Sequence, residues 1–214
     1  GDVDSGYPDS DGDGTANCVD STVFADDFND LSWDEWSTVD LDGDSNPDWD
    51  MTGFTLSEDS DRAFAAAIGP DLGELESYTI SVDAWSGGYY NNAIGIVFAY
   101  QDEDNLMLLT WDDFNGFYGA YSPDGEVTLW EVSGGTWTAL ESDDNAGDYV
   151  MDYGTWTALS LTVDGSEVIF SVDGSTYLEH SYSGSSPIGA DHIGVFSYDN
   201  DQGVYFDDFE VTQP

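Results

Sequence analysis

The sequence predicts an all-β domain in which antiparallel strands form a two-layer sandwich, preceded by a short acidic segment. Short stretches rich in β-branched and aromatic residues recur along the chain, separated at regular intervals by clusters of Gly, Asp and Ser. No long stretch has the 3.6-residue apolar period of an amphipathic helix. The 214 residues, 40% of them hydrophobic, are enough for one large domain with a real core and an appendage.

Each expected strand is marked by its apolar pattern. Residues 78–84 alternate apolar and polar side chains, which indicates a half-buried strand, whereas residues 94–100 are apolar on both faces, as in the centre of a sandwich. Asp-Gly pairs at 164–165 and 173–174 predict tight hairpin turns, because Asp-Gly accepts positive φ angles. Residues 62–69 fit either one helical turn or an Ala-rich strand. The other expected strands are 106–111, 125–132, 156–163, 168–172, 193–198 and 204–211.

The charge balance excludes several classes of partner. The chain has 46 acidic residues against one Lys or Arg, which is Arg62, and a formal net charge of −45. Such a surface repels nucleic acids and anionic membranes, and no apolar run is long enough for a membrane-spanning helix. A charge of this size destabilises a compact fold unless salt or cations screen it. We therefore expect the protein of a salt-adapted organism.

Residues 9–20 have the ligand spacing of a calcium-binding loop. Gly14 stands at the sixth position, where the chain must turn sharply, and Asp20 replaces the bidentate Glu of an EF-hand at the twelfth. No helical pattern flanks the loop, so an EF-hand pair is excluded. An acidic solvated turn is the alternative, and the register of the oxygen donors argues against it. The expected calcium ligands are Asp9, Asp11, Asp13, Thr15 through its carbonyl, Asn17 and Asp20.

A second acidic cluster, residues 40–51, repeats the beginning of this pattern. It lacks a Gly at the sixth position and ends on Met51 instead of an acid, so a complete calcium cage is not expected. Two interpretations stay open, a looser calcium site completed by water and a solvated surface loop. The candidate ligands are Asp40, Asp42, Asp44, Asn46 and Asp48.

The single cysteine, Cys18, and the first residue, Gly1, favour an exported piece of a longer protein. An odd cysteine in a secreted chain has lost its partner or pairs between molecules. The chain begins without Met or a signal peptide. We expect a secreted or cell-surface location.

The motifs at both ends of the chain resemble known extracellular modules. The loop at 9–20, with Cys18 near its end, resembles a thrombospondin type 3 repeat, a secreted calcium-binding module. Downstream, the order and spacing of segments 24–28, 95–105 and 205–211 resemble the laminin-G-like or concanavalin-A-like jelly-roll domains appended to bacterial surface proteins and hydrolases. The thrombospondin C-terminal domain belongs to that group and also follows type 3 repeats. We therefore expect a calcium-binding linker over residues 1–22 and a jelly-roll domain over 23–214.

The resemblance implies two antiparallel sheets, structural calcium, and adhesion or carbohydrate binding in place of catalysis. It makes two acid pairs candidates for a further calcium site that ties the first strand to the last: Asp26 or Asp27 with Asp207 or Asp208. The alternative is that these are solvated acids at strand ends. In type 3 repeats, a cysteine such as Cys18 pairs with one in a neighbouring repeat.

Known catalytic patterns are missing from the sequence. Laminarinase-like enzymes place nucleophile and acid on one strand in a Glu-x-Asp-x-Glu or Glu-x-Asp-x-x-Glu string, which this chain lacks; its nearest acids, Asp34 and Glu35, fall in an expected loop. Lyases that act on uronic acids need basic residues, and His180 and His192 lie on separate expected segments. A glycan-active enzyme is therefore the least favoured reading.

Aromatic side chains near turns favour glycan binding, because sugar C–H faces stack on rings and carboxylates accept sugar hydroxyls. Trp111, just before an acidic turn, and Tyr118 are the candidate ligand-binding residues, against the alternative that they belong to the core. The expected function is a non-catalytic, calcium-binding extracellular module for adhesion or carbohydrate binding, with more than one calcium ion. Its expected partner is a polysaccharide, a cell-surface glycan or an adhesion protein. The alternative is a structural stalk made rigid by calcium.

Overall fold

The structure is a computed structural model that describes residues 22–41, 43, 47–53, 55–58, 64–73, 75–87, 93–112, 126–143, 154–182, 192–198 and 203–214. Within these residues the chain forms β-strands and no helix, as the sequence predicts. The strands are β1 (Thr22–Asp26), β2 (Ser37–Asp40), β3 (Trp49–Thr52), β4 (Thr55–Glu58), β5 (Phe64–Asp71), β6 (Ser77–Ser86), β7 (Ala93–Asp102), β8 (Asn105–Asp112), β9 (Glu126–Ser133), β10 (Thr136–Asp143), β11 (Trp156–Asp164), β12 (Glu167–Val172), β13 (Ser175–Ser181), β14 (His192–Tyr198) and β15 (Val204–Thr212).

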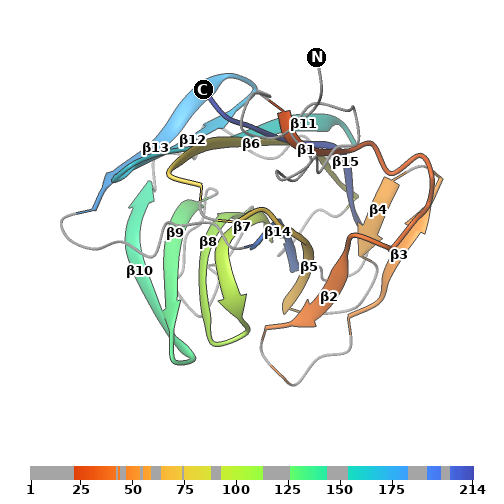
Figure 1. Cartoon of the computed structure of the whole chain (residues 1–214), viewed down its shortest axis with the longest axis horizontal. Helices are drawn as coiled ribbons and strands as arrows, with labels where there is room; N and C mark the ends of the chain where they lie inside the picture. Colours follow the sequence, from red (N-terminus) through yellow and green to blue (C-terminus); the bar gives the residue numbers. More distant parts are fainter. Residues whose placement is uncertain are drawn as a thin grey trace, which may run out of the picture.

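The strands form two stacked antiparallel sheets, which confirms the predicted sandwich (Figure 1). In the described residues, one sheet has eight strands in the order β13-β12-β11-β6-β15-β4-β3, with β1 paired to β15 as well. The other has seven strands in the order β10-β9-β8-β7-β14-β5-β2. The antiparallel pairing of β1 with β15 joins the first and last of these strands through backbone hydrogen bonds.

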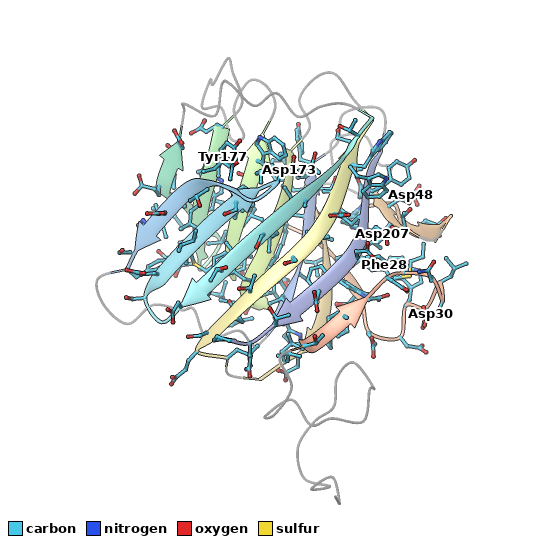
Figure 2. All side chains as sticks on the ribbon, turned by 90° about the horizontal axis from the view of Figure 1, so that it is seen from above. Phe28, Asp30, Asp48, Asp173, Tyr177 and Asp207 are labelled. Carbon is cyan, nitrogen blue, oxygen red and sulfur yellow. The ribbon has the colours of Figure 1, made fainter. Side chains whose placement is uncertain are left out.

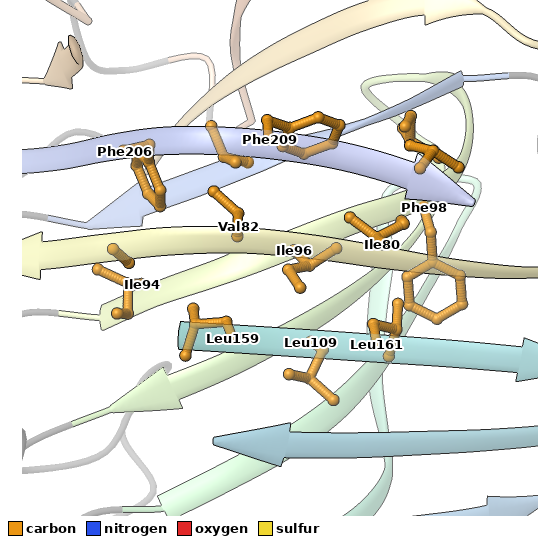
Figure 3. Close-up of a cluster of buried hydrophobic side chains, with 14 of the residues drawn as sticks. Ile80, Val82, Ile94, Ile96, Phe98, Leu109, Leu159, Leu161, Phe206 and Phe209 are labelled. Carbon is orange, nitrogen blue, oxygen red and sulfur yellow. The ribbon is translucent and has the colours of Figure 1, made fainter. Parts of the chain in front are cut away.

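The main core lies between the two sheets, where the inward side chains of both meet (Figure 3). Strand β6 shows how the sequence specifies this: Tyr78, Ile80, Val82 and Ala84 are buried, and the polar side chains between them face outward. Facing them from the seven-stranded sheet are residues such as Ile96 of β7. Burial of these apolar side chains is the dominant favourable term in folding.

The β12–β13 connection confirms the predicted Asp-Gly turn. Asp173 and Gly174 have φ angles of 48° and 76°, the pair of positive values that a type I′ turn requires. The Asp173 amide donates to the Ala158 carbonyl at 2.8 Å, and its carboxylate accepts from the Ala158 amide at 3.0 Å. The turn is therefore fastened to β11, the strand beside its own hairpin.

Small residues let strands of the seven-stranded sheet approach closely. The Ala-rich segment that fitted a helical turn or a strand forms strand β5. A Cβ at Gly95 of β7 would lie 2.1 Å from the Leu109 carbonyl oxygen, and one at Gly194 of β14 would lie 2.1 Å from the Ala67 carbonyl oxygen. These two positions require glycine because the neighbouring backbone occupies the space of a side chain.

The outer face of the seven-stranded sheet carries a second apolar cluster. Val97, Leu108 and Phe196 on this face are fully buried. The rings of Phe64 on β5 and Trp137 on β10 lie 6.4 Å apart, although four strands separate β5 from β10 in the sheet. Aromatic side chains from the two halves of the sheet therefore meet over this face.

Candidate functional site

Three aromatic side chains form a row on the outer face of the eight-stranded sheet. Trp156 of β11 lies directly opposite Trp85 of β6, and Trp85 lies directly opposite Tyr205 of β15. Trp156 is 46% exposed, and Trp85 and Tyr205 are half-buried. Among the described residues, only Leu31 is an equally exposed large apolar side chain. We call these three residues the aromatic row.

Backbone hydrogen bonds fix the strand ends that carry the aromatic row. The Gly87 amide donates to the Gly203 carbonyl at 3.1 Å, which joins the end of β6 to the start of β15. The Gly154 amide donates to the Ser86 carbonyl at 3.1 Å, which joins β6 to the approach of β11. The rings of Trp85 and Tyr205 are 5.0 Å apart at an interplanar angle of 73°, an edge-to-face contact. The row is therefore held on a rigid scaffold.

A second row, of acidic character, lies two residues further along the same strands. Asp83 of β6 pairs with Ala158 of β11 on one side and with Asp207 of β15 on the other. Figure 2 looks onto this outer face and labels Asp207 and Asp173. A β-bulge follows Asp207, and Asp208 within it has a φ of 48°. Carboxylates thus border the aromatic row beside Trp85 and Tyr205.

Burial and nearby acids raise the pKa of both carboxylates in this second row. The pKa of Asp83 is raised by burial and then by the negative charges of Asp208 and Asp173. The pKa of Asp207 is raised by burial and then by the charges of Asp208, Asp27 and Asp83, against a lowering by its hydrogen bond from the Asp208 amide. No Lys or Arg lies among the described residues, so no strong base offsets this charge there.

The structure corrects the prediction for Trp111. Its side chain is 3% exposed and belongs to the core between the sheets, on the same face of β8 as Met107 and Leu109. A buried ring has no free face on which a sugar can stack, so Trp111 is a packing residue. Tyr118, the other predicted ligand-binding residue, lies outside the described residues.

The acid pairs expected to tie the first and last strands through calcium lie near each other but do not converge. Asp26 already has two internal partners: its carboxylate accepts from the Phe28 amide at 2.7 Å and from the Trp36 indole N–H at 2.6 Å. Asp27 is exposed, and hydrogen bonds from Asn29 lower its pKa. In the part of the chain that the structure describes, no three acidic, His or Cys side chains are arranged to hold a metal ion. A calcium site at these strand-end carboxylates stays a prediction.

The other expected calcium ligands are mostly outside the described residues. This holds for the whole first loop: Asp9, Asp11, Asp13, Thr15, Asn17 and Asp20. It also holds for Asp42, Asp44 and Asn46 of the second cluster. Asp40 accepts from the Gly43 amide at 3.0 Å, and the Asp48 amide donates to Glu58 at 3.2 Å. Calcium in both loops stays a prediction.

The residues considered for catalysis are dispersed, as expected. Asp34 and Glu35 lie in the loop between β1 and β2, where burial and the charges of Asp26, Asp30 and Asp34 raise the pKa of Glu35. His180 on β13 lies 3.4 Å from Glu141 on β10. His192 on β14 lies 3.2 Å from the Gly69 carbonyl oxygen.

Sequence reasoning missed the aromatic row, although part of the signal was present. Because Tyr78, Ile80, Val82 and Ala84 face inward, the alternation also places Asp83 and Trp85 on the outer face. The alignment of Trp85 with Trp156 and Tyr205 depends on pairing between distant strands, which no local pattern gives.

Solved structures with the same fold include domains that bind or cleave carbohydrates. The carbohydrate-binding module CBM66 from Bacillus subtilis matches with a TM-score of 0.59 at 16% identity over 84% of this chain and 96% of its own. A Bacillus subtilis protein of unknown function with a galectin-like fold matches with a TM-score of 0.61 at 14% identity over 90% of this chain and 96% of its own.

A glycoside hydrolase family 16 endo-glucanase from Bacteroides ovatus matches with a TM-score of 0.63 at 11% identity, over 88% of this chain and 99% of its own. These likenesses establish a concanavalin-A-like jelly-roll fold. No family model and no curated protein matches the sequence, and no thrombospondin repeat is indicated. Within the described residues, no helix is long and apolar enough to span a bilayer.

Proposed function

We propose that the domain is a non-catalytic carbohydrate-binding module and that its site is the aromatic row. The observation that carries the proposal is the exposed Trp156 ring, in register with two further rings on a rigid sheet. Exposed aromatic side chains held in place are the usual anchors of binding surfaces, because they bury a large area with little loss of side-chain freedom.

The dimensions of the row suit a short stretch of glycan. Trp156 and Tyr205 are two strand spacings apart, about 10 Å, which is close to the length of a disaccharide. Sugar C–H faces would stack on the rings, and the carboxylates of Asp83 and Asp207 would accept hydroxyl protons. Because Trp85 and Tyr205 meet edge to face, the two rings present different surfaces to a sugar.

The placement of carboxylates favours binding over hydrolysis. The matched solved structures include both a carbohydrate-binding module and an endo-glucanase, so the fold alone permits either role. The sequence has no Glu-x-Asp-x-Glu or Glu-x-Asp-x-x-Glu string that would supply nucleophile and acid on one strand, and the raised pKa values of Asp83 and Asp207 do not by themselves assign either role. The outer face of β7, β8 and β14 carries apolar, Gly, Thr and Tyr side chains together with His192, and Gln101 and Asp102 stand at the exposed end of β7.

We also propose that residues 9–20 bind calcium and that the protein works outside the cell. The spacing of the six oxygen donors supports the first point. Extracellular modules bind calcium with Kd values of about 10⁻⁴ to 10⁻³ M, so such a loop fills outside the cell and stays empty in the cytosol. Chelation should disorder this segment and leave the sandwich folded.

The test is a glycan screen at 1 M NaCl, run in millimolar calcium and again in chelator, followed by titration of each bound polysaccharide. Trp156→Ala should weaken binding by about 30-fold, the loss typical of an interface hot spot, with little change in melting temperature. Trp85→Ala should act in the same direction. The screen also includes a turnover assay on β-glucans.

Leu31→Ala provides a matched control, because Leu31 has the same exposure as Trp156 but lies in the loop between β1 and β2. This variant should bind as the unmodified protein does. Glycan binding that survives both tryptophan substitutions, or no binding by the folded protein, would reject the site. Release of reducing ends would reject the non-catalytic assignment.

A further inference from the structure

The carboxylates beside the aromatic row carry information about the ligand, provided that the proposed function holds. Asp83 and Asp207 lie directly opposite each other, two residues along their strands from Trp85 and Tyr205. Two residues of strand span about 7 Å, roughly the width of a pyranose ring. A sugar stacked on the row therefore extends its substituents over these two carboxylates.

The third strand, β11, has no carboxylate in this acidic row. The residue of β11 opposite Asp83 is Ala158, whose short exposed side chain leaves space beside Trp156. On the far side of Ala158 lies Asp173, whose carboxylate accepts the Ala158 amide. Acids therefore lie on both sides of Ala158. Asp173 is close enough to Asp83 that its charge contributes to the raised pKa of Asp83.

The carboxylates beside the rings offer hydrogen-bond acceptors and no donors. Ionised carboxylates only accept hydrogen bonds, whereas the donors of the row itself are the two indole N–H groups and the Tyr205 hydroxyl. None of the described residues is Lys or Arg, the side chains that bind carboxylate and sulfate groups in glycans. A ligand must therefore supply hydroxyl donors and carry no negative charge where it crosses Asp83 and Asp207.

We propose that the aromatic row selects uncharged glycans over anionic ones, and that the contact carboxylates Asp83 and Asp207 make this selection. The total charge of −45 would also repel anions at low salt, but that effect is long-ranged. At 1 M NaCl the screening length is about 3 Å, so only groups in contact with the ligand still discriminate. Selection that persists in molar salt is the mark of these two side chains.

The experiment compares each neutral polysaccharide that binds in the screen with two derivatives of the same chain, one carboxymethylated and one hydroxyethylated. The hydroxyethyl group matches the added bulk without charge. At 1 M NaCl the carboxymethylated chain should bind about tenfold more weakly than the parent, the cost of one like-charge contact. The hydroxyethylated chain should bind as the parent does.

The variant Asp83→Asn/Asp207→Asn should bring the ratio between parent and carboxymethylated chain close to one. The control variant Glu76→Gln/Glu103→Gln removes the same charge from exposed positions, at the far end of β6 and in the β7–β8 turn, and should keep the tenfold ratio. The single variant Asp207→Asn gives an intermediate ratio and serves if the double variant does not fold.

Equal binding of parent and carboxymethylated chain by the unmodified protein would overturn the proposal, as would an equal effect of the two double variants. Failure of the proposed function has a different signature, because then no neutral chain binds, or Trp156→Ala binds as tightly as the unmodified protein. The two failures are therefore distinguishable in one set of titrations.

Discussion

Replacing Asp26 with Ala tests whether this residue is an internal cap or a calcium ligand. Its carboxylate accepts from the Phe28 amide and from the indole of Trp36, which is 6% exposed. Phe28 has a φ of 52°, so the first bond also holds a backbone conformation that Phe rarely adopts. In Asp26→Ala, a buried donor and a strained turn both lose their partner.

The magnitude follows from the two bonds. A hydrogen bond to a charged group contributes about 1.5–3 kcal/mol, and a buried donor left unpaired costs a similar amount. We expect Asp26→Ala to lower the free energy of unfolding by about 3 kcal/mol or more, which corresponds to a fall in melting temperature of about 6–12 °C for a domain of this size. Asp27→Ala is the matched neighbour; its exposed side chain should cost less than about 0.5 kcal/mol.

The assay is thermal unfolding of the unmodified protein and both variants at 1 M NaCl, in millimolar calcium and in chelator. An internal cap predicts the same loss for Asp26→Ala in both conditions, because neither hydrogen bond involves a metal ion. A calcium ligand predicts a loss that is present in calcium and disappears in chelator. The second result, or a loss no larger than that of Asp27→Ala, would refute the reasoning.

Four further predictions follow from the packing and the charges. Trp111→Ala should lower the free energy of unfolding by about 4 kcal/mol in denaturant titration, because it empties a core position; a loss near zero would place the ring at the surface. Gly95→Ala should cost about 3 kcal/mol, while Gly69→Ala, whose Cβ would meet the nearest atom at 3.5 Å, should be almost neutral; equal effects would contradict the close approach. Asp83→Asn should stabilise the protein at neutral pH, since the fold raises the pKa of Asp83 above 3.8 and so penalises its charged form; this gain should vanish as the pH falls through the raised pKa to below 3.8, and a gain that persists in acid would exclude a charge effect. Finally, the unfolding midpoint should rise between low and molar NaCl, and a flat profile would remove the expectation of salt adaptation.

Local patterns in the sequence predict the sandwich well, because a strand with one buried face must alternate. The alternation at residues 78–84 identifies β6 and its inward side chains, and the Asp-Gly pair at 173–174 identifies a turn. The Ala-rich segment now seen as β5 stayed open between a helical turn and a strand, because both of its faces are buried and alternation disappears.

The loss of alternation in a strand with two buried faces also explains why the prediction for Trp111 is wrong. Residues 106–111 are apolar except for Thr110, so the sequence does not clearly say which face of β8 is inward, and the position of Trp111 before an acidic turn favours a surface residue. The two apolar clusters, one on each face of this sheet, are the physical reason for the run. The aromatic row needed the register of β6 with β11 and β15, strands that lie far apart in the chain.

The pairing of the first strand with the last has a mechanical consequence. Thr22 lies opposite Thr212, so the points where the chain enters and leaves the sandwich are one strand spacing apart, about 5 Å. Tension applied at these two points would break the hydrogen bonds between β1 and β15 one after another, starting at the strand ends. It would not load all of these bonds at the same time. The folded domain holds these two points close together, and its opening would release about 650 Å of chain between them. Under tension the domain would therefore unfold at low force and with a large extension.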